Sequence, residues 1–483
     1  MTTRTSAGRA AEIRASLDHP IVDADGHFVE VGPLLNEEVI AYVEEAGGAA
    51  LRERFLGSGV APTDTSSNLA DRGDPSVREQ WRAMPSWWGW PTHDARDRAT
   101  AHLPRLLYER LDELGIDFTI LYPSMSLAFF EVADEELSSV LCRAVNRSHA
   151  RLFAPYADRC TVGALVPMNT PEQAVAEAEY AVRELGAKSI LIAGYARRAV
   201  GRDAYRLDMF GLDSEHDYDP FWRACVELGV APVVHSALQH HRVTRSISNY
   251  VYNHVNGLAA AHESLCKSLF LAGVTRRFPD LRIGFLEGGV AWACALFAGL
   301  VGHWEKRNRD AIAGLDPDRL DVDALMGWFA DYGDDAVLAR LDELRAYFSR
   351  PGVRPAVLDE FEACGIARPE DLRDLFVDNF YFGCEADDPL LAWAFREDVN
   401  PLGARMRPVL GSDISHWDVP DMTEPIPEAY ELVEHGVIGE REFRELVFVN
   451  PVLLHGGPNP SFFAGTVCEE AAEGVLGSEA GRP

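Results

Sequence analysis

The chain has 483 residues, a formal net charge of −31, and 47% hydrophobic residues. The length fits one large α/β barrel with insertions or two to three ordinary domains. The excess of negative charge repels nucleic acid and anionic membranes, so neither is an expected partner. No apolar run reaches 18 residues, and the sequence therefore predicts no transmembrane helix.

The amino terminus and the cysteines indicate the cellular compartment. Residues 1–16 are polar and lack the apolar segment of a secretory signal. The eight cysteines are scattered singly, without a CxxC pair or a disulfide-like spacing. We therefore expect a cytoplasmic protein with reduced thiols.

Eight apolar, strand-like runs alternate with helical patterns along the chain. No Gly-rich dinucleotide fingerprint or Walker loop follows any of these runs. Buried strands that alternate with helices favour a parallel sheet, and eight such units predict a (β/α)8 TIM barrel in a single domain over residues 1–483. Two stretches lie outside the repeat. Residues 28–115 are expected to form a cap-like insertion after strand one, and residues 313–375 a helical insertion after strand six.

The first predicted strand, residues 22–27, carries two carboxylates and an imidazole in alternation. Because side chains two apart on a strand share a face, Asp23, Asp25 and His27 are expected on one side. Neighbouring carboxylates repel unless a cation lies between them, which favours a divalent metal ion. Asp23, one step deeper, is expected to orient the ligands rather than to bind. A solvated strand edge with an incidental histidine is the alternative.

Three later strands also end in ionisable residues, and a buried charge is costly unless it is paired or bound to a metal. His235 ends strand five, Glu287 ends strand six, and Asp413 ends strand eight. The carboxyl ends of the strands form the active site in barrels of this kind. We therefore expect these residues to share one metal site with Asp25 and His27.

Four further histidines lie near these strand ends. His254, just over one turn into the helix after strand five, is expected as a metal ligand, with a structural role equally open. His262 lies two turns further on and is a weaker candidate, and His303 lies far enough along its helix to be structural. His416 follows Asp413 by three residues, so a ligand, an orienting partner and a proton shuttle are all open.

On these residues the chain resembles the amidohydrolase superfamily, in particular its amidohydrolase 2 branch of decarboxylases and hydrolases. That resemblance implies histidines on strands one, five and six and an aspartate on strand eight. Here Asp25 stands in place of the first histidine, and Glu287 in place of the sixth-strand histidine. The carboxylated lysine of the family has no match, because Lys188 lies at the start of strand four. The two exchanges make the site harder, which suits iron or manganese better than zinc.

The sequence is also similar to a smaller group with this barrel, the non-haem diiron monooxygenases, represented by the diterpenoid hydroxylase of platensimycin and platencin biosynthesis. The similarity rests on residues 23–27, 253–254, 285–289 and 411–418. It implies dioxygen as a reactant, an apolar and CoA-linked substrate, and two iron ions held by Asp25, His27, His235, His254, Glu287 and Asp413. This oxygenase reading is the main expectation from the sequence.

Two other functions are open at this point. A hydrolase or decarboxylase would use one zinc or manganese ion, with Asp413 or His416 as general base. A binding protein on a decayed barrel is disfavoured, because an idle site would retain costly charges. Replacement of Glu287 by alanine is expected to abolish activity in either enzyme. A homo-oligomer is compatible with the sequence.

Substrate-binding residues are expected in the cap and after strand four. Trp88 and Trp90 belong to a tryptophan-rich stretch that would line an apolar pocket, with a small satellite core equally open. Arg197, Arg198 and Arg202 follow strand four, and their guanidinium groups suit a phosphate or carboxylate, such as the phosphates of a CoA thioester. Salt bridges with neighbouring aspartates are the alternative.

Overall fold

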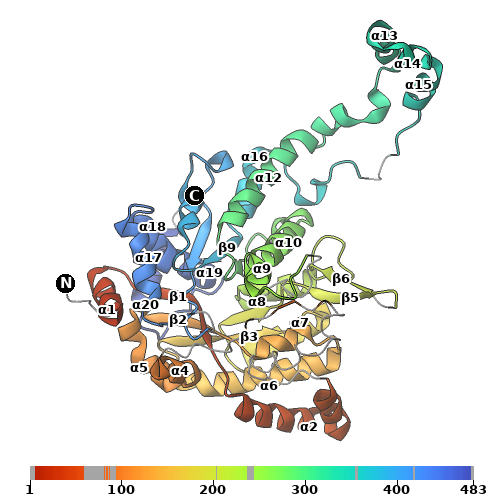
Figure 1. Ribbon diagram of the computed structural model, residues 1–483. Helices are drawn as coiled ribbons and strands as arrows, with labels where there is room; N and C mark the ends of the chain where they lie inside the picture. Colours follow the sequence, from red (N-terminus) through yellow and green to blue (C-terminus); the bar gives the residue numbers. More distant parts are fainter. Residues whose placement is uncertain are drawn as a thin grey trace.

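Eight parallel strands form the barrel of this protein, which is represented by a computed structural model (Figure 1). The structure describes residues 6–58, 81, 83–84, 86, 94–202, 204–235, 244–353, 357–416 and 419–479. The strands are hydrogen-bonded in the order in which they follow along the chain. They are β1 (Val22–Phe28), β2 (Phe118–Pro123), β3 (Cys160–Val166), β4 (Ser189–Ile192), β7 (Pro232–Val234), β8 (Ile283–Phe285), β9 (Phe380–Cys384) and β10 (Arg407–Leu410). The predicted TIM barrel is confirmed.

Helices surround the strands. Two of the longer helices begin at residues with clear sequence signals: Asp134 and Thr170 accept hydrogen bonds at their starts, and Pro171 occupies a first helical position. The helices are α1 (Ser6–Ser16), α2 (Gly32–Gly57), α4 (Ala95–His102), α5 (Pro104–Leu114), α6 (Glu135–Phe153), α7 (Pro171–Arg183), α8 (Asp219–Leu228), α9 (Tyr250–His254), α10 (Gly257–Leu271), α11 (Val274–Arg277), α12 (Ala291–Arg307), α13 (Val322–Tyr332), α14 (Asp335–Leu338), α15 (Leu341–Phe348), α16 (Pro369–Val377), α17 (Pro425–Glu434), α18 (Glu440–Arg444), α19 (Asn450–Gly456) and α20 (Glu469–Glu479).

The chain that follows β10 closes the barrel against β1. The Asp413 backbone N–H donates to the Asp25 carbonyl at 3.0 Å, and the His27 N–H donates to the Ile414 carbonyl at 3.0 Å. The closing hydrogen bonds are therefore made by the same residues, or their neighbours, that the sequence predicts as metal ligands.

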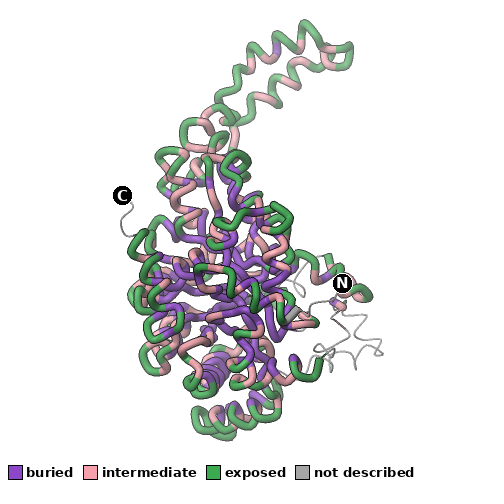
Figure 2. The backbone as a smooth tube through the Cα atoms, turned by 90° about the vertical axis from the view of Figure 1, so that its left-hand side faces the viewer, coloured by how far each residue is buried: buried purple, intermediate pink, exposed green. Residues whose placement is uncertain are grey.

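A helical arm rises from the barrel beyond α12. Helices α13, α14 and α15 lie at its far end, well away from the strands (Figures 1 and 2). Of the side chains in these three helices, only that of Met326 is buried. The arm begins within the predicted insertion 313–375, whereas the end of that stretch, α16, packs on the barrel. Nearer the amino terminus, helix α2 belongs to the predicted insertion 28–115. It lies against α6, which follows that insertion in the sequence (Figure 1). None of the described helices is long and apolar enough to cross a bilayer.

Acid lability of the fold is expected to come partly from His455. This residue of α19 is buried, its ring stacks on Phe462 with centroids 4.8 Å apart, and burial lowers its pKa to about 3. The unfolded chain binds a proton near the ordinary pKa of 6.5, so stability from the neutral ring is lost as the pH falls from 6.5 towards 3. His455→Phe should remove a slope of up to about 1.4 kcal/mol per pH unit in the free energy of unfolding.

Urea unfolding at several pH values between 7 and 5 measures this slope. The control is His303→Phe, at an exposed histidine, which should leave the slope of the wild-type protein unchanged. An unchanged slope in His455→Phe would contradict the assignment.

Candidate metal centre

A β-bulge shapes the first strand where the candidate site begins. The pairing of β1 with β2 shifts by one residue between Asp23 and Gly26, and a bulge of this kind re-aims the side chains that follow it. A Cβ atom on Gly26 would lie 2.5 Å from the Asp23 Oδ2 atom and 2.7 Å from Thr119 Oγ1. Glycine is therefore required at this position, because any side chain would displace the Asp23 carboxylate.

The Asp23 carboxylate fastens three segments of the site together. It accepts hydrogen bonds from Thr119 Oγ1 at 2.7 Å, from Ser412 Oγ at 2.8 Å, from the Ser412 N–H at 3.0 Å and from the Asp25 N–H at 3.3 Å. Burial raises the pKa of Asp23, and these hydrogen bonds oppose the rise. The contacts connect β1 with β2 and with the segment after β10, and they fix the backbone on both sides of Asp413.

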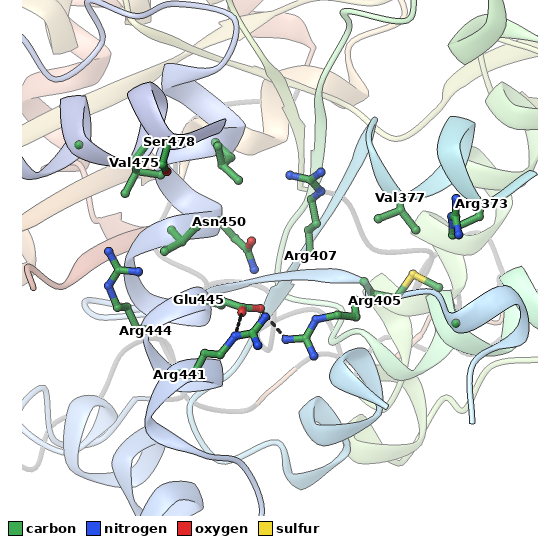
Figure 3. Close-up of a pocket in the computed structure, with 15 residues that line it drawn as sticks. Arg373, Val377, Arg405, Arg407, Arg441, Arg444, Glu445, Asn450, Val475 and Ser478 are labelled. Carbon is green, nitrogen blue, oxygen red and sulfur yellow. Dashed lines mark hydrogen bonds and ion pairs between the residues drawn. The ribbon is translucent and has the colours of Figure 1, made fainter. Parts of the chain in front are cut away.

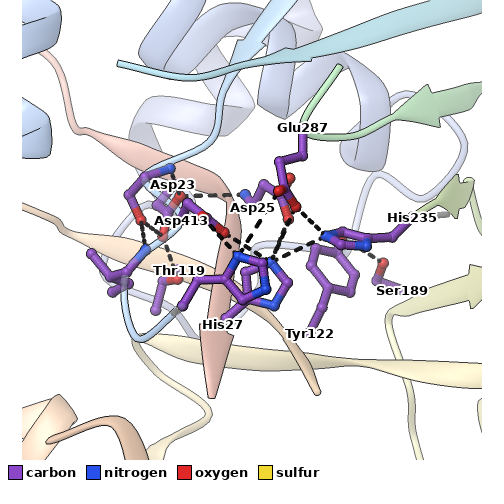
Figure 4. A network of polar contacts seen from close by, with 12 residues as sticks. Asp23, Asp25, His27, Thr119, Tyr122, Ser189, His235, Glu287 and Asp413 are labelled. Atoms are coloured by element: carbon purple, nitrogen blue, oxygen red, sulfur yellow. Dashed lines mark hydrogen bonds and ion pairs between the residues drawn. The ribbon is translucent and has the colours of Figure 1, made fainter. Parts of the chain in front are cut away.

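Two carboxylates of the site lie on strained backbone. Glu287 has a φ of 56° and Asp413 a φ of 50°, in the left-handed region that residues other than glycine rarely adopt. Such a conformation costs about 1–3 kcal/mol and persists only where its surroundings impose it, which occurs most often at functional sites. The strain places the side chains of both residues at the barrel mouth (Figure 4).

The side chains from four strand ends converge on His27. Its Nε2 atom lies 3.1 Å from Asp413 Oδ1, 3.2 Å from His235 Nε2, 3.7 Å from Asp25 Oδ1 and 4.0 Å from Glu287 Oε2 (Figure 4). The Glu287 Oε2 atom is also 2.6 Å from His235 Nε2. Residues separated by almost 400 positions in the sequence thus place their ligand atoms around one point.

His416 joins this group from the segment after β10. Its Nδ1 atom is 2.9 Å from Asp413 Oδ2 and 3.9 Å from Glu287 Oε1. The imidazole stacks on that of His27, with ring centroids 4.3 Å apart. The hydrogen bond to Asp413 fixes the orientation of the ring against the other ligand atoms.

The charges of the cluster are unfavourable without a cation. Burial, together with the negative charge of Glu287, raises the pKa of Asp25 well above its usual range. Burial also lowers the pKa of His27 well below its ordinary value, and the neighbouring imidazoles add to this effect. A bound cation would stabilise the ionised carboxylates and use the neutral imidazoles as ligands.

A divalent metal ion fits these residues. The Asp25 Oδ1 atom is buried and has no hydrogen-bond partner among the described residues. Carboxylate oxygens and imidazole nitrogens are suitable ligands for manganese and zinc. In each of two groups the ligand atoms all lie within 4.8 Å of one another: His27, Glu287, Asp413 and His416 in one, and Asp25, His27 and His235 in the other.

The other predicted histidines lie outside these two groups. His254 is half-buried and stacks on Tyr250, with ring centroids 5.1 Å apart. His262 is buried beside the site, and burial lowers its pKa to about 3. Its Nδ1 atom would lie 2.7 Å from a Cβ on Gly288, so the glycine is what allows the ring to approach. His303 is exposed on α12.

A pocket of about 450 Å³ adjoins the cluster at Glu287. Among the residues that line it are His254, Trp292, Glu385 and Asp388. The sequence analysis did not single out Glu385, although it follows the apolar strand β9 directly. The criterion that found Glu287, an ionisable residue after a buried strand, could have found it.

The arginines after strand four lie in a β-hairpin rather than in an open loop. Strands β5 (Ala196–Val200) and β6 (Ala204–Asp208) pair in antiparallel fashion. The Arg198 guanidinium pairs with Asp208 at 3.0 Å and donates to the Asn169 carbonyl at 2.6 Å and to the Tyr218 hydroxyl at 2.8 Å. These contacts hold the hairpin on the barrel, which is the salt-bridge alternative considered from the sequence.

The two other predicted arginines lie at the surface. Arg197 and Arg202 are exposed, and the Arg197 guanidinium lies over the Tyr205 ring, 4.7 Å from its centroid. Trp88 and Trp90 lie outside the described residues.

Residues 22–348 match the amidohydrolase family, and because this is more than half of the chain, the protein belongs to that family. Similar solved structures include an amidohydrolase from Mycobacterium avium subsp. paratuberculosis, at 17% identity and a TM-score of 0.51, which covers 91% of this chain and 100% of the other.

Two further similar structures are named as decarboxylases. 2,6-Dihydroxybenzoate decarboxylase from Rhizobium is 17% identical, with a TM-score of 0.49 over 90% of this chain and 98% of the other. 5-Carboxyvanillate decarboxylase from Novosphingobium aromaticivorans, in complex with manganese, is 15% identical, with a TM-score of 0.49 over 91% of this chain and 96% of the other. At these identities the likeness concerns the fold.

The expected diiron monooxygenase is wrong. The family match over residues 22–348 is to amidohydrolases, and the similar structure with a TM-score of 0.51 is also named as an amidohydrolase. The expected oxidoreductase class is therefore wrong as well. Neither the family match nor the similar structures support two iron ions, dioxygen or a CoA-linked substrate. The error has a chemical reason: carboxylates and imidazoles suit one divalent ion as well as two irons, so ligand type alone did not decide between them.

Asp23 provides a test of how the site is held together. Asp23→Asn replaces an acceptor oxygen by a donor NH2 group beside the Ser412 N–H and hydroxyl, so the segment that carries Asp413 loses its anchor. Loss of such a supporting contact typically weakens metal binding by about 10- to 100-fold. Manganese titration against a competing chelator measures the change. Asp18→Asn, at an exposed carboxylate, should bind as the wild type does; equal affinity in Asp23→Asn would contradict the anchoring role.

Proposed function

We propose that the protein is a metal-dependent decarboxylase that uses one divalent ion, manganese in the first instance, to release CO2 from a small aromatic carboxylic acid. The observation that carries the proposal is the convergence of buried imidazoles and carboxylates at the barrel mouth. Both candidate groups of ligands include His27. One ion near the Nε2 atom of His27 would therefore be within reach of ligand atoms from both groups. Family membership supports metal-dependent chemistry on a carbonyl or carboxyl group.

The proposed ligands come from four strand ends: His27, His235, Glu287 and Asp413, with Asp25 beside them. When bound, the ion would act as a Lewis acid toward a carboxylate or carbonyl oxygen of the substrate. Asp23 holds the segment around Asp413, and the burial of the whole cluster excludes water from it. The protein thereby presents preformed ligands rather than assembling them on binding.

His416 is the proposed proton donor. In decarboxylation the bond between the ring carbon and the carboxyl carbon breaks, CO2 leaves, and the electron pair on the ring carbon takes up a proton. The Nδ1 atom of His416 is held at 2.9 Å from Asp413 Oδ2, so Nε2 is the atom through which this proton would pass. Histidine suits this role because its ordinary pKa lies near neutrality.

The pocket beside Glu287 is the proposed substrate site. Its volume of about 450 Å³ accommodates a single aromatic ring with substituents. Leu258 and Trp292 supply apolar wall, while His254 and Glu385 supply polar groups. A hydroxyl group on such a ring would donate a hydrogen bond to the carboxylate of Glu385.

Hydrolysis of a carbonyl compound is the second candidate, and the match to the amidohydrolase family favours it. The same cluster would serve, with His416 or Asp413 accepting a proton from water instead of donating one to carbon. Release of CO2 separates the two reactions.

Glu287 tests the proposed activity. Assays of CO2 release with 2,6-dihydroxybenzoate and 5-carboxyvanillate should show turnover by the manganese-loaded protein, and Glu287→Ala should lower it at least 1,000-fold, about 4 kcal/mol in the activation barrier. Glu305→Ala, at an exposed position on α12 after the same strand, should retain full activity. Near-wild-type turnover by Glu287→Ala would remove that residue from the site. Hydrolysis without CO2 release would favour the second candidate.

Metal removal gives a readout that does not depend on the substrate. The ionised carboxylates repel one another when no cation is bound, so manganese should raise the thermal midpoint of the chelator-treated protein. Elemental analysis should find one manganese per chain. Asp413→Asn should lose most of the stabilisation by manganese, while Asp310→Asn, at an exposed position after α12, should retain it. If manganese leaves the thermal midpoint of the wild-type protein unchanged, the proposed metal site is contradicted.

A further inference from the structure

A second pocket, of about 900 Å³, lies at the opposite end of the barrel from the candidate metal centre. Arg407, which begins β10, is one of its lining residues, whereas Asp413 follows the other end of that strand. All eight barrel strands are parallel, so the start of β10 lies at the amino-terminal face of the barrel. Active sites of this fold lie at the carboxyl-terminal face, and the pocket is therefore separate from the catalytic mouth.

Arginine side chains gather in this pocket, in a chain whose net charge is −31. Its lining includes one carboxylate, that of Glu445, against five arginines: Arg373, Arg405, Arg407, Arg441 and Arg444 (Figure 3). Some of these arginines also pair with acidic residues outside the lining, Asp374 and Asp378 among them. Arg405 also pairs with Glu397 and Glu442, so the feature that distinguishes the pocket is the gathering of guanidinium groups on its wall rather than a net charge.

Glu445 holds two of the guanidinium groups side by side. Its Oε2 atom is 2.8 Å from Arg405 Nη2, and its Oε1 atom is 3.0 Å from Arg441 Nε (Figure 3). Arg444 makes no ion pair with a described residue, and its guanidinium lies over the Phe448 ring, 5.9 Å from the centroid. The pocket thus combines two arginines whose orientation is set by a shared carboxylate with one whose charge is not neutralised by a described partner.

The backbone beside the pocket is unusual. Residues Glu445–Val449 form a π-helix between α18 and α19, and both end residues line the pocket. A π-helix is rare and occurs frequently at functional sites. This irregular turn supports the same site independently of the arginines.

We propose that this pocket binds an organic phosphate, such as a nucleotide. Guanidinium groups match the geometry of phosphate oxygens in bidentate fashion, and several arginines suit a ligand with more than one negative charge. Val377, Met406, Leu453 and Val475 provide an apolar wall for the organic part of such a ligand. The proposal does not depend on the reaction at the metal centre.

Isothermal titration calorimetry with ADP, supplied as its magnesium complex to the metal-loaded protein, tests the site. One ADP per chain should bind, and the double variant Arg441→Glu/Arg444→Glu should raise the dissociation constant at least tenfold. Arg441 is largely exposed, with 74% of its side chain accessible, so its replacement leaves the core intact. Arg105→Glu, at another exposed helical arginine that pairs with a glutamate, is the matched control and should bind as the wild type does.

Three results would overturn the proposal. These are the absence of ADP binding by the wild-type protein, equal binding by the double variant, and loss of ADP binding in Asp413→Asn with retention in the double variant. The last result would assign the nucleotide to the metal centre instead. Circular dichroism of each variant establishes that it is folded.

Discussion

Carboxylates that are buried together require a cation, and this constraint organises the mouth of the barrel. Asp25, Glu287 and Asp413 lie within a few ångströms of the His27 imidazole, away from solvent. Burial and mutual repulsion oppose their ionisation, which is visible in the raised pKa of Asp25. A divalent ion would resolve this conflict, whereas the hydrogen bonds among the described residues leave Asp25 Oδ1 without a hydrogen-bond partner.

The rest of the fold holds these groups in place against their repulsion. The strained backbone of Asp413 persists because the segment after β10 is bonded to β1 and to the Asp23 carboxylate. On either side of Glu287, the Leu286 N–H donates to the Val234 carbonyl and the Gly289 N–H to the Gly383 carbonyl. Close packing adds to this: a Cβ atom on Gly411 would lie 3.0 Å from the Asp25 Cβ atom. The site is therefore built into the closure of the barrel rather than carried on a separate loop. Such preorganisation is what metal-dependent catalysis requires of the protein.

The sequence predicted the barrel and the convergence of its strand ends, because parallel strands bring their carboxyl ends to one face whatever lies between them. His27, His235, Glu287 and Asp413 could be grouped on that basis alone. His254 lies outside the cluster, because its position depends on tertiary packing that periodicity does not encode. The pairing of Arg198 with Asp208 is the salt-bridge alternative that the sequence leaves open. The nature of the reaction was predicted wrongly, since ligand types fix neither the number of metal ions nor the substrate.

The position of a bound ion is the most direct test of this account. Crystals grown with manganese should give one anomalous peak, at coordination distance from His27 Nε2, His235 Nε2 and a carboxylate oxygen of Asp413. A single peak there would show that the cation, and not hydrogen bonding alone, offsets the repulsion of the buried carboxylates. No peak at the barrel mouth, a peak beyond reach of these three residues, or two peaks of equal height would contradict the account.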